Sequence, residues 1–232
     1  MLNVGIVGAA GYAGAELVRI VLRHPEFKLC VATSNSDAGN LLSSVYPAFT
    51  GVTDLAFSKH DDPALFDCDI VFLATPHTVA MKSAPGLLEA GVTVVDLSAD
   101  YRLRDRATYE KWYKVTHTSP ELLATATFGL PELNRDALSQ AALRHKNGEA
   151  VLVACAGCYP TATSLAAAPV IELSQGVVVA DAISGVSGAG RSATARTHFV
   201  SANENFEAYG VTSHRHTPEI EQILSIPGRL IF

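Results

Sequence analysis

What this 232-residue sequence lacks excludes several classes of protein. No run of about 18 apolar residues occurs, the length that a membrane-spanning helix needs, so no membrane partner is predicted. No cluster of Lys and Arg occurs either, and the net charge is -6, which disfavours nucleic acid as a partner. The N-terminus has no basic segment followed by a small-residue cleavage site, so no secretory signal is predicted. With 48% hydrophobic residues, the composition is that of a globular protein with a substantial core.

Cysteine is also scarce, with 4 residues in the chain. Cys30 and Cys68 lie in or beside apolar runs, where a reduced cysteine packs like a small hydrophobic residue. Cys155 and Cys158 form a C-x-x-C pair, but zinc would need a second ligand pair with similar spacing, so no metal is predicted. A thiol–disulfide redox pair stays open as an alternative for these two residues. Without a secretory signal, a reducing compartment such as the cytoplasm is expected.

Apolar runs alternate with amphipathic stretches along the first half of the chain. The pattern predicts helices at residues 13–22 and about 79–90, and strands at residues 2–7, 28–33, 70–74 and 92–96. Strands separated by helices of this length predict βαβ units and a parallel sheet covered on both faces. The predicted fold class is therefore α/β, with a doubly wound sheet of the Rossmann type.

A composition shift near residue 150 divides the chain into two predicted units, 1–149 and 150–232. Residues 149–154 and 177–183 are strand-like, and the alanine-rich segment 161–173 predicts a helix. Two strands alone bury little surface. We therefore expect the second unit, of α+β type, either to be completed by a partner chain or to be a C-terminally incomplete domain.

A glycine-rich turn follows the first predicted strand and opens the first predicted helix. Its spacing is G-x-x-G-x-x-G over residues 8–14. Such a turn lets the backbone approach a pyrophosphate, which then lies at the positive end of the helix. A plain strand-to-helix turn is the alternative. On the cofactor interpretation, the residues expected to bind the dinucleotide are Gly8, Gly11, Tyr12, Ala13 and Gly14.

The end of the second strand bears on the choice between NAD and NADP. Sites that prefer NAD usually place an acidic residue there to hold the ribose hydroxyls. This sequence has Ser34 and Ser36, and no acid until Asp37. Small hydroxyl side chains accept a 2′-phosphate without charge repulsion, so NADP(H) is the predicted cofactor. Thr75 follows the next strand and is expected to line the same crevice.

Cys158 is the predicted nucleophile. It lies between a strand and an alanine-rich helix, with Gly157 before it and Pro160 at the expected first helical position. A thiol at a helix N-terminus faces unpaired N–H donors and the positive end of the dipole, and both favour the reactive thiolate. For Cys155, within the apolar strand, inert packing is the better interpretation.

The segment from Ser213 to Ile220 holds the predicted acid/base catalyst. His216 precedes a helix expected to start at Pro218 with Thr217 as its N-cap, and Glu219 is expected to reach back and orient the histidine. Arg215 is expected to hold an anionic group of the substrate. A capping segment with a surface histidine is the alternative.

Two further segments are expected to line the site. Residues 184–191 form a glycine-rich loop in which Ser187 and Gly188 are expected to contact the cofactor and Arg191 the substrate, unless it is only a flexible surface loop. Ser98 and Arg102 follow the strand at 92–96 and are expected to contact the substrate, because the carboxyl ends of parallel strands face the ligand crevice.

Together these segments resemble the N-acetyl-γ-glutamyl-phosphate reductases, a family of the aspartate-semialdehyde dehydrogenase superfamily. The family's nucleophilic cysteine falls on Cys158 and its catalytic histidine on His216, with His214 as the less favoured histidine. The resemblance implies a nucleotide-binding Rossmann domain over 1–149 and part of a catalytic domain over 150–232. It extends over residues 8–14, 74–77, 96–102, 128–132, 156–161, 184–191 and 214–220.

The resemblance implies a specific reaction. NADPH would reduce N-acetyl-γ-glutamyl phosphate through a Cys158 thioester, giving N-acetylglutamate 5-semialdehyde and inorganic phosphate, a step of arginine biosynthesis. It also implies a homo-oligomer, and members with further strands and a terminal helix that this chain does not include. A sister enzyme acting on aspartyl phosphate and a non-catalytic NADP-binding fragment remain the alternatives.

Overall fold

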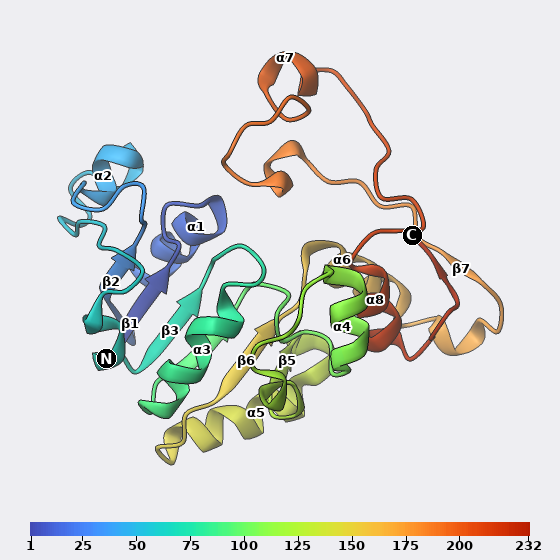
Figure 1. The fold of residues 1–232 in the computed structure, drawn as a ribbon, viewed down its shortest axis with the longest axis horizontal. Coiled ribbons are helices and arrows are strands. Elements are labelled where there is room, and N and C mark those ends of the chain that lie inside the picture. The colour runs from blue at the N-terminus through green and yellow to red at the C-terminus, as the bar shows by residue number, and fades with distance from the viewer.

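The computed structural model describes residues 1–232, and its main body is one parallel sheet of six strands (Figure 1). The strand order is β2-β1-β3-β4-β6-β5, and every neighbouring pair is parallel. The α/β fold predicted from the sequence is confirmed. The strands are β1 (Leu2–Val7), β2 (Phe27–Thr33), β3 (Ile70–Leu73), β4 (Thr93–Asp96), β5 (Thr127–Gly129) and β6 (Leu152–Cys155).

The sheet is buried on both faces because its strands are apolar on both sides. In β1, Val4 and Ile6 belong to one buried cluster and Val7 to another. Successive strand residues point to opposite faces, so the two clusters lie on the two sides of the sheet. The cluster of Val4 and Ile6 includes Val18 of α1 (Tyr12–Val21), whereas that of Val7 includes Met81 of α3 (Ala80–Glu89).

The remaining helices connect the strands or cover their ends. The longest, α5, packs against β5, and the α1 helix packs against β1 and β2. The α-helices not yet given are α2 (Leu42–Val45), α4 (Arg106–Tyr113), α5 (Pro131–Lys146), α6 (Cys158–Ala167), α7 (Phe199–Ala202) and α8 (Thr217–Leu224). Short 3-10 turns are η1 (Pro47–Phe49), η2 (Pro63–Asp67), η3 (Pro120–Ala124), η4 (Ile171–Leu173) and η5 (Val186–Ala189). None of the helices combines the length and the apolar character that crossing a lipid bilayer requires.

The first sheet extends beyond the composition shift at residue 150. Strand β6 pairs with β4 on one side and β5 on the other, so it belongs to the sheet of the first unit. Strand β5 and the long helix α5 lie between β4 and β6, where the sequence pattern predicted no strand. The alanine-rich helix also differs from the prediction: α6 begins at Cys158 and ends at Ala167. The Ala168 N–H still donates to the Ser164 carbonyl oxygen, but Pro169 has no N–H to continue the helical hydrogen bonds, so the helix ends early.

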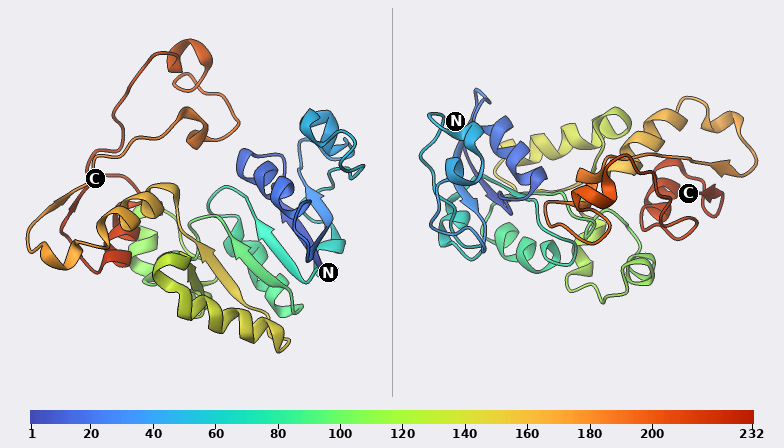
Figure 2. Two further views of the ribbon diagram at one scale, coloured as in Figure 1. Left: turned by 180° about the vertical axis from the view of Figure 1, so that it is seen from behind. Right: turned by 90° about the horizontal axis from the view of Figure 1, so that it is seen from above.

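The second unit is small and open. Helices α6 and α8 pack together over a cluster of Ile220, Leu224, Ile226 and Leu230, and the only strands are the two-residue pair β7 (Val178–Val179) and β8 (Leu230–Ile231). Residues 181–213, which we call the arm, extend from this unit with α7 at their far end (Figures 1 and 2). The arm arches over the carboxyl edge of the sheet towards α1.

Candidate functional site

The glycine turn has the close backbone approach that a dinucleotide site needs. Gly8 has a φ of +84°, and a Cβ there would lie 2.5 Å from the carbonyl oxygen of Ala74. A Cβ on Gly14 would overlap the Gly8 carbonyl oxygen, whereas one on Gly11 would meet it at 3.5 Å. Glycine is therefore required at the first and third positions of this turn, where β1 and β3 lie side by side.

The start of α1 has free hydrogen-bond donors. The backbone N–H groups of Tyr12, Ala13 and Gly14 donate to no protein acceptor, and no acidic residue lies in the first helical turn. The Thr75 hydroxyl, beside Gly8, is buried and also has no partner. Unpaired donors at a helix N-terminus match the negative charge of a pyrophosphate. These residues therefore fit the dinucleotide predicted from the sequence.

Ser34 and Ser36 lie at the end of β2, as expected, but their hydroxyls already have an acceptor. Both donate to Asp37 Oδ2, at 2.8 and 2.7 Å. The bonds from Ser36 and Ser34 hold the pKa of Asp37 below its usual value. Asp37, the residue that the sequence interpretation passed over, is thus the central charged group at this strand end.

Arg191 was expected to contact the substrate, but the structure places it at the nucleotide turn. Its Nη1 donates to the carbonyl oxygen of Ala10 at 3.2 Å and lies 3.6 Å from Asp37 Oδ2. The guanidinium also lies over the ring of Tyr46, 5.8 Å from its centroid. Ser187 and Gly188 belong to the exposed 3-10 turn η5 of the same loop. The loop of residues 184–191 therefore reaches the cofactor side of the molecule.

Cys158 is the first residue of α6 and is exposed. The preceding residue, Gly157, is the N-cap and offers no side chain to the helix end. The N–H groups of Cys158 and Tyr159 donate to no protein acceptor. The thiol thus lies beside two free donors at the positive end of a helix, an arrangement that can stabilise a developing negative charge.

His216 lies directly against Gly157, the neighbour of Cys158. A Cβ on Gly157 would lie 2.7 Å from His216 Nε2 and 2.7 Å from Arg102 Nη1. Burial, followed by the charge of Arg102, lowers the pKa of His216 to about 3. Its Nε2 lies 3.5 Å from Arg102 Nη1, and its Nδ1 is buried without a partner. The structure shows no hydrogen bond between the histidine and the thiol.

Glu219 does not orient His216 as the sequence interpretation expected. Its Oε1 accepts a hydrogen bond of 2.9 Å from the Gly157 N–H, and its Oε2 lies 3.4 Å from Arg102 Nη1. The carboxyl is buried, and burial raises its pKa. Glu219 therefore ties α8 to the turn before Cys158, and it acts on His216 indirectly, through their shared helix end and through Arg102 Nη1.

Arg102 was expected to contact the substrate, and the structure gives it buried protein partners instead. Its Nε donates to the carbonyl oxygen of Cys155 at 2.7 Å, and its Nη2 to that of Leu97 at 2.6 Å. With Glu219 on Nη1, all parts of the guanidinium are engaged. These contacts join the ends of β4 and β6 to α8. Because Arg102 is only 6% exposed, we assign it this structural role.

Ser98 is likewise buried in a hydrogen-bond network rather than facing a ligand. Its hydroxyl donates to Asp96 Oδ2 at 2.9 Å and accepts from the Asp100 N–H at 3.1 Å. Asp96 is fully buried, and burial raises the pKa of its carboxyl to about 7. This network fixes the loop that carries Arg102.

His214 lies in an aromatic cluster at the base of the arm. Its ring meets those of Tyr159 and Phe232 at centroid distances of 5.4 and 5.0 Å, and its Nδ1 accepts from the His216 N–H. Burial, followed by the charge of Arg215, lowers its pKa. Of the two histidines, His216 is the one in contact with Gly157, so the geometry favours it as the partner of Cys158.

Arg215 lies at the same end of the sheet, with its guanidinium over the ring of Tyr113 at 5.4 Å. The same ring meets His77 edge-on at 5.4 Å. The sequence interpretation assigned no role to His77, although its position after β3 was a signal. Burial and the charges of Arg215 and Arg102 lower its pKa to about 4.

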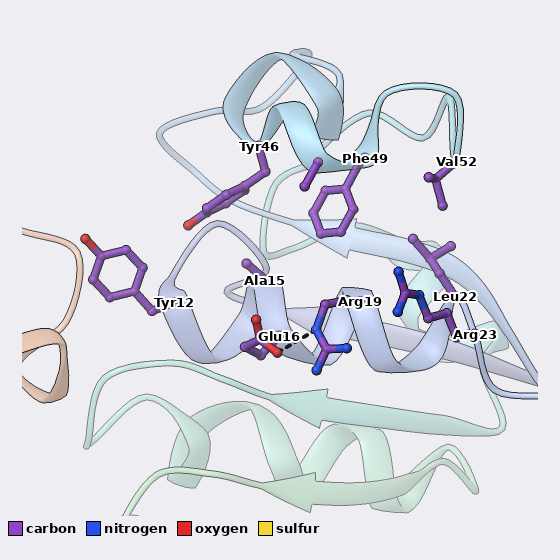
Figure 3. Close-up of a pocket in the computed structure, with 10 residues that line it drawn as sticks. Tyr12, Ala15, Glu16, Arg19, Leu22, Arg23, Tyr46, Phe49 and Val52 are labelled. Carbon is purple, nitrogen blue, oxygen red and sulfur yellow. Dashed lines mark hydrogen bonds and ion pairs between the residues drawn. The ribbon is translucent and has the colours of Figure 1, made fainter.

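Cys158 does not line either of two cavities in the structure. The larger, of about 410 Å³, lies between α1 and the α2–η1 segment, where Tyr46 and Phe49 face Ala15 and the ion pair of Glu16 with Arg19 (Figure 3). The other, of about 270 Å³, lies between the base of the arm and Phe232. Neither contains the nucleophile, so neither defines the reaction. No group of three or more His, Cys, Asp or Glu side chains is placed to hold a metal ion.

Comparison with protein families matches both units. The NAD-binding domain of semialdehyde dehydrogenases matches residues 3–141, and their dimerisation domain matches residues 158–230. The N-acetyl-gamma-glutamyl-phosphate reductase of Halorhodospira halophila is 52% identical over 228 residues, which cover 97% of this chain and 64% of that protein. The reductase of Herminiimonas arsenicoxydans is 49% identical, and the match covers 100% of this chain and 66% of that protein. The chain thus spans about two thirds of the length of these relatives.

Solved structures share the fold at low sequence identity. Aspartate semialdehyde dehydrogenase II from Vibrio cholerae has a TM-score of 0.62 at 17% identity, covering 100% of this chain and 68% of that one. The enzyme from Candida albicans, solved with NADP, has a TM-score of 0.56 at 20% identity, covering 82% of this chain and 53% of that one. The relatives of about half identity confirm the resemblance predicted from the motifs.

Proposed function

Because this chain belongs to the semialdehyde dehydrogenase family, we propose that it carries the cofactor site and the nucleophile of an NADP-dependent N-acetyl-γ-glutamyl-phosphate reductase. The observation that carries the proposal is the placement of Cys158. The thiol is exposed at the start of α6, with free N–H donors beside it and His216 packed on the adjacent Gly157. Relatives with this name are about half identical to the chain along nearly its whole length.

The first step is nucleophilic. The Cys158 sulfur attacks the acyl carbon of N-acetyl-γ-glutamyl phosphate, a C–S bond forms, and inorganic phosphate leaves with the electrons of the C–O bond. The N–H groups of Cys158 and Tyr159, which have no protein acceptor, are the donors proposed for the oxygen that becomes negative. The product of this step is a thioester on Cys158.

The second step is reductive. NADPH bound at the glycine turn would supply the hydride that reduces the thioester. The resulting oxyanion takes a proton, and the C–S bond then breaks to give the semialdehyde and regenerate the thiol. His216 is the residue proposed to exchange this proton, because its Nε2 edge lies against Gly157, next to Cys158. Glu219 and Arg102 hold the turn before Cys158 and the histidine helix together.

The remaining assignments follow the same proposal. Gly8, Gly14 and the free N–H groups of α1 would bind the pyrophosphate, with Thr75 beside them. Residues 158–230 match a dimerisation domain, which supports a homo-oligomer. All four cysteines are free, which supports a reducing compartment such as the cytoplasm.

The test is phosphate-dependent reduction of NADP with N-acetylglutamate 5-semialdehyde, measured at 340 nm on this chain and two variants. Cys158→Ser is expected to abolish the reaction, because an alcohol is a far poorer nucleophile and leaving group than a thiolate. Cys155→Ser, the matched control, is expected to retain most of the rate. Equal rates for wild type and Cys158→Ser would refute the mechanism.

Three other functions predict different results. Turnover of aspartate semialdehyde alone would assign the chain to the sister enzymes. NADP binding without any turnover would indicate a nucleotide-binding fragment. Loss of function in Cys155→Ser would favour a disulfide exchange between the two cysteines.

A further inference from the structure

The loop after β3 holds a histidine that neither the sequence interpretation nor the mechanism uses. His77 Nδ1 accepts a hydrogen bond of 3.0 Å from the Ala99 N–H. An imidazole nitrogen that accepts from an amide carries no proton, so the neutral ring of His77 has its proton on Nε2. The opposite edge of the ring is therefore a fixed N–H donor.

The backbone beside His77 is strained and held in place. Thr78 has a φ of +76°, a conformation that a β-branched residue adopts only when its surroundings impose it. The buried Asp100 carboxylate accepts from the Thr78 N–H at 2.7 Å and the Met81 N–H at 3.0 Å. The Tyr109 hydroxyl donates to the same carboxylate at 2.7 Å. Strain maintained by a buried carboxylate indicates that the orientation of this loop matters to function.

The neighbours of His77 are the groups of the reaction site. Tyr113 packs edge-on against its ring and also carries the guanidinium of Arg215 on its face. Arg215 directly precedes His216 in the chain, and its charge is the second cause, after burial, of the lowered pKa of His77. A neutral N–H donor and a guanidinium therefore flank one aromatic ring next to the acid/base histidine, an arrangement suited to an anionic oxygen.

We propose that His77 binds an anionic oxygen of the substrate through Nε2–H, together with Arg215, and so positions the acyl group at Cys158. This inference rests on the proposed function. Two groups of that substrate have a negatively charged oxygen that can accept this hydrogen bond: its carboxylate and its phosphoryl group. Because the histidine is neutral and its tautomer is fixed, it contributes one directed hydrogen bond rather than a charge.

The test uses a readout that does not need turnover. Iodoacetamide alkylates the exposed Cys158, and a ligand bound beside it slows that reaction, which mass spectrometry measures. N-acetylglutamate tests whether the site binds the carboxylate, and inorganic phosphate tests whether it binds the phosphoryl group. One of them is expected to protect the wild-type thiol.

Two substitutions separate the two edges of the ring. His77→Asn keeps an acceptor for the Ala99 N–H but loses the distal donor, so the protecting concentration is expected to rise about tenfold. His77→Gln keeps a donor near the Nε2 position and is expected to stay within about threefold of wild type. NADPH affinity, measured by its fluorescence, is expected to be unchanged in both variants.

Several outcomes would overturn the proposal. These are protection of His77→Asn at the wild-type concentration, an equal loss in both variants, or no protection of wild type by either anion. If His77→Asn fails to fold, 15N-histidine NMR of the wild-type chain decides, since the protecting anion must shift the Nε2–H resonance of His77. Protection that depends on His77 in a chain without turnover would support this site while refuting the proposed function.

Discussion

The parallel sheet and the arm contain similar apolar residues but place them in opposite surroundings. Val4, Val71 and Leu73 in the sheet are completely buried. In the arm, Phe199 is 77% and Phe206 is 74% exposed. The sheet obtains its stability from its own side chains, because helices cover both faces. The arm lacks a covering surface in the single chain, so its conformation depends on a few polar contacts.

The candidate site also has one part on the buried sheet and another on the exposed arm. The glycine turn, Thr75 and Cys158 lie at the ends of sheet strands or at the start of helices packed on them. Ser187 and Gly188 lie in the exposed arm and reach the nucleotide side chiefly through Arg191. Rigid elements therefore carry the proposed chemistry, and the arm supplies a cover whose position can adjust.

The largest expected contrast is in core truncation. Leu73→Ala is expected to lower the free energy of unfolding by about 2–5 kcal/mol, because it leaves a cavity in the buried cluster that includes Met81 of α3. Phe199→Ala, the matched change in the arm, is expected to change it by less than about 0.5 kcal/mol. Urea denaturation followed by circular dichroism measures both. Similar losses at the two positions would show that the arm is packed in solution.

A second contrast concerns pH. The folded-state pKa of Asp96, about 7, lies above its unfolded value of 3.8, so the folded chain retains a proton that the unfolded chain releases. The free energy of unfolding therefore falls as pH rises from 4 to 7, by at most about 4 kcal/mol from this group. Asp96→Asn is expected to remove that decline. Glu207→Gln in the arm, where the carboxylate forms an exposed pair with Arg196, serves as the control. Parallel pH profiles for wild type and Asp96→Asn would contradict the prediction.

A third contrast compares two glycines. Gly157→Ala is expected to cost about 1–3 kcal/mol and to displace His216, because its Cβ would press on that ring and on Arg102. Gly176→Ala at the base of β7 meets no atom within 4 Å and is expected to be neutral or slightly stabilising. Thermal unfolding and the Cys158 alkylation rate are the measurements. A tolerated Gly157→Ala would mean that the histidine does not lie on this turn.

The smallest expected effect is on the contact between the arm and the sheet. Arg191→Ala removes a partly exposed ion pair with Asp37, so the free energy of unfolding is expected to change by less than about 1 kcal/mol. Cleavage of the arm by trypsin at Arg196 is nevertheless expected to be faster, because the arm loses a contact with the nucleotide turn. Unchanged cleavage would show that this contact does not restrain the arm.

The strands of the first half of the chain could be predicted from local sequence patterns. Buried parallel strands are continuous apolar runs, so β1, β2, β3 and β4 were predicted within about two residues. Strand β5 has three residues and one of them is glycine, so its existence depends on the neighbouring β6 and not on its own sequence. The membership of β6 in the first sheet is likewise a long-range property.

The site was predictable as a set of positions and less so as a set of contacts. The glycine turn and the helix start at Cys158 each follow from residues adjacent in sequence. The partners of Glu219, Arg102 and Arg191 lie far away in the chain, so local patterns predicted the chemistry of these side chains but not the residues that they contact. The role we propose for His77 depends on Ala99 and Tyr113, which no local pattern connects to it.

The strand order has a consequence for the order of events during synthesis. Strand β5 precedes β6 in the chain, yet β6 separates it from β4. Until residues 152–155 leave the ribosome, β5 has no partner and the edge of β4 is unpaired. Of the six strands in this sheet, β6 is therefore the last to be synthesised, and Cys158 follows its final residue by three positions. The nucleophile therefore reaches its place only after all six strands of the sheet that carries the cofactor turn have been synthesised.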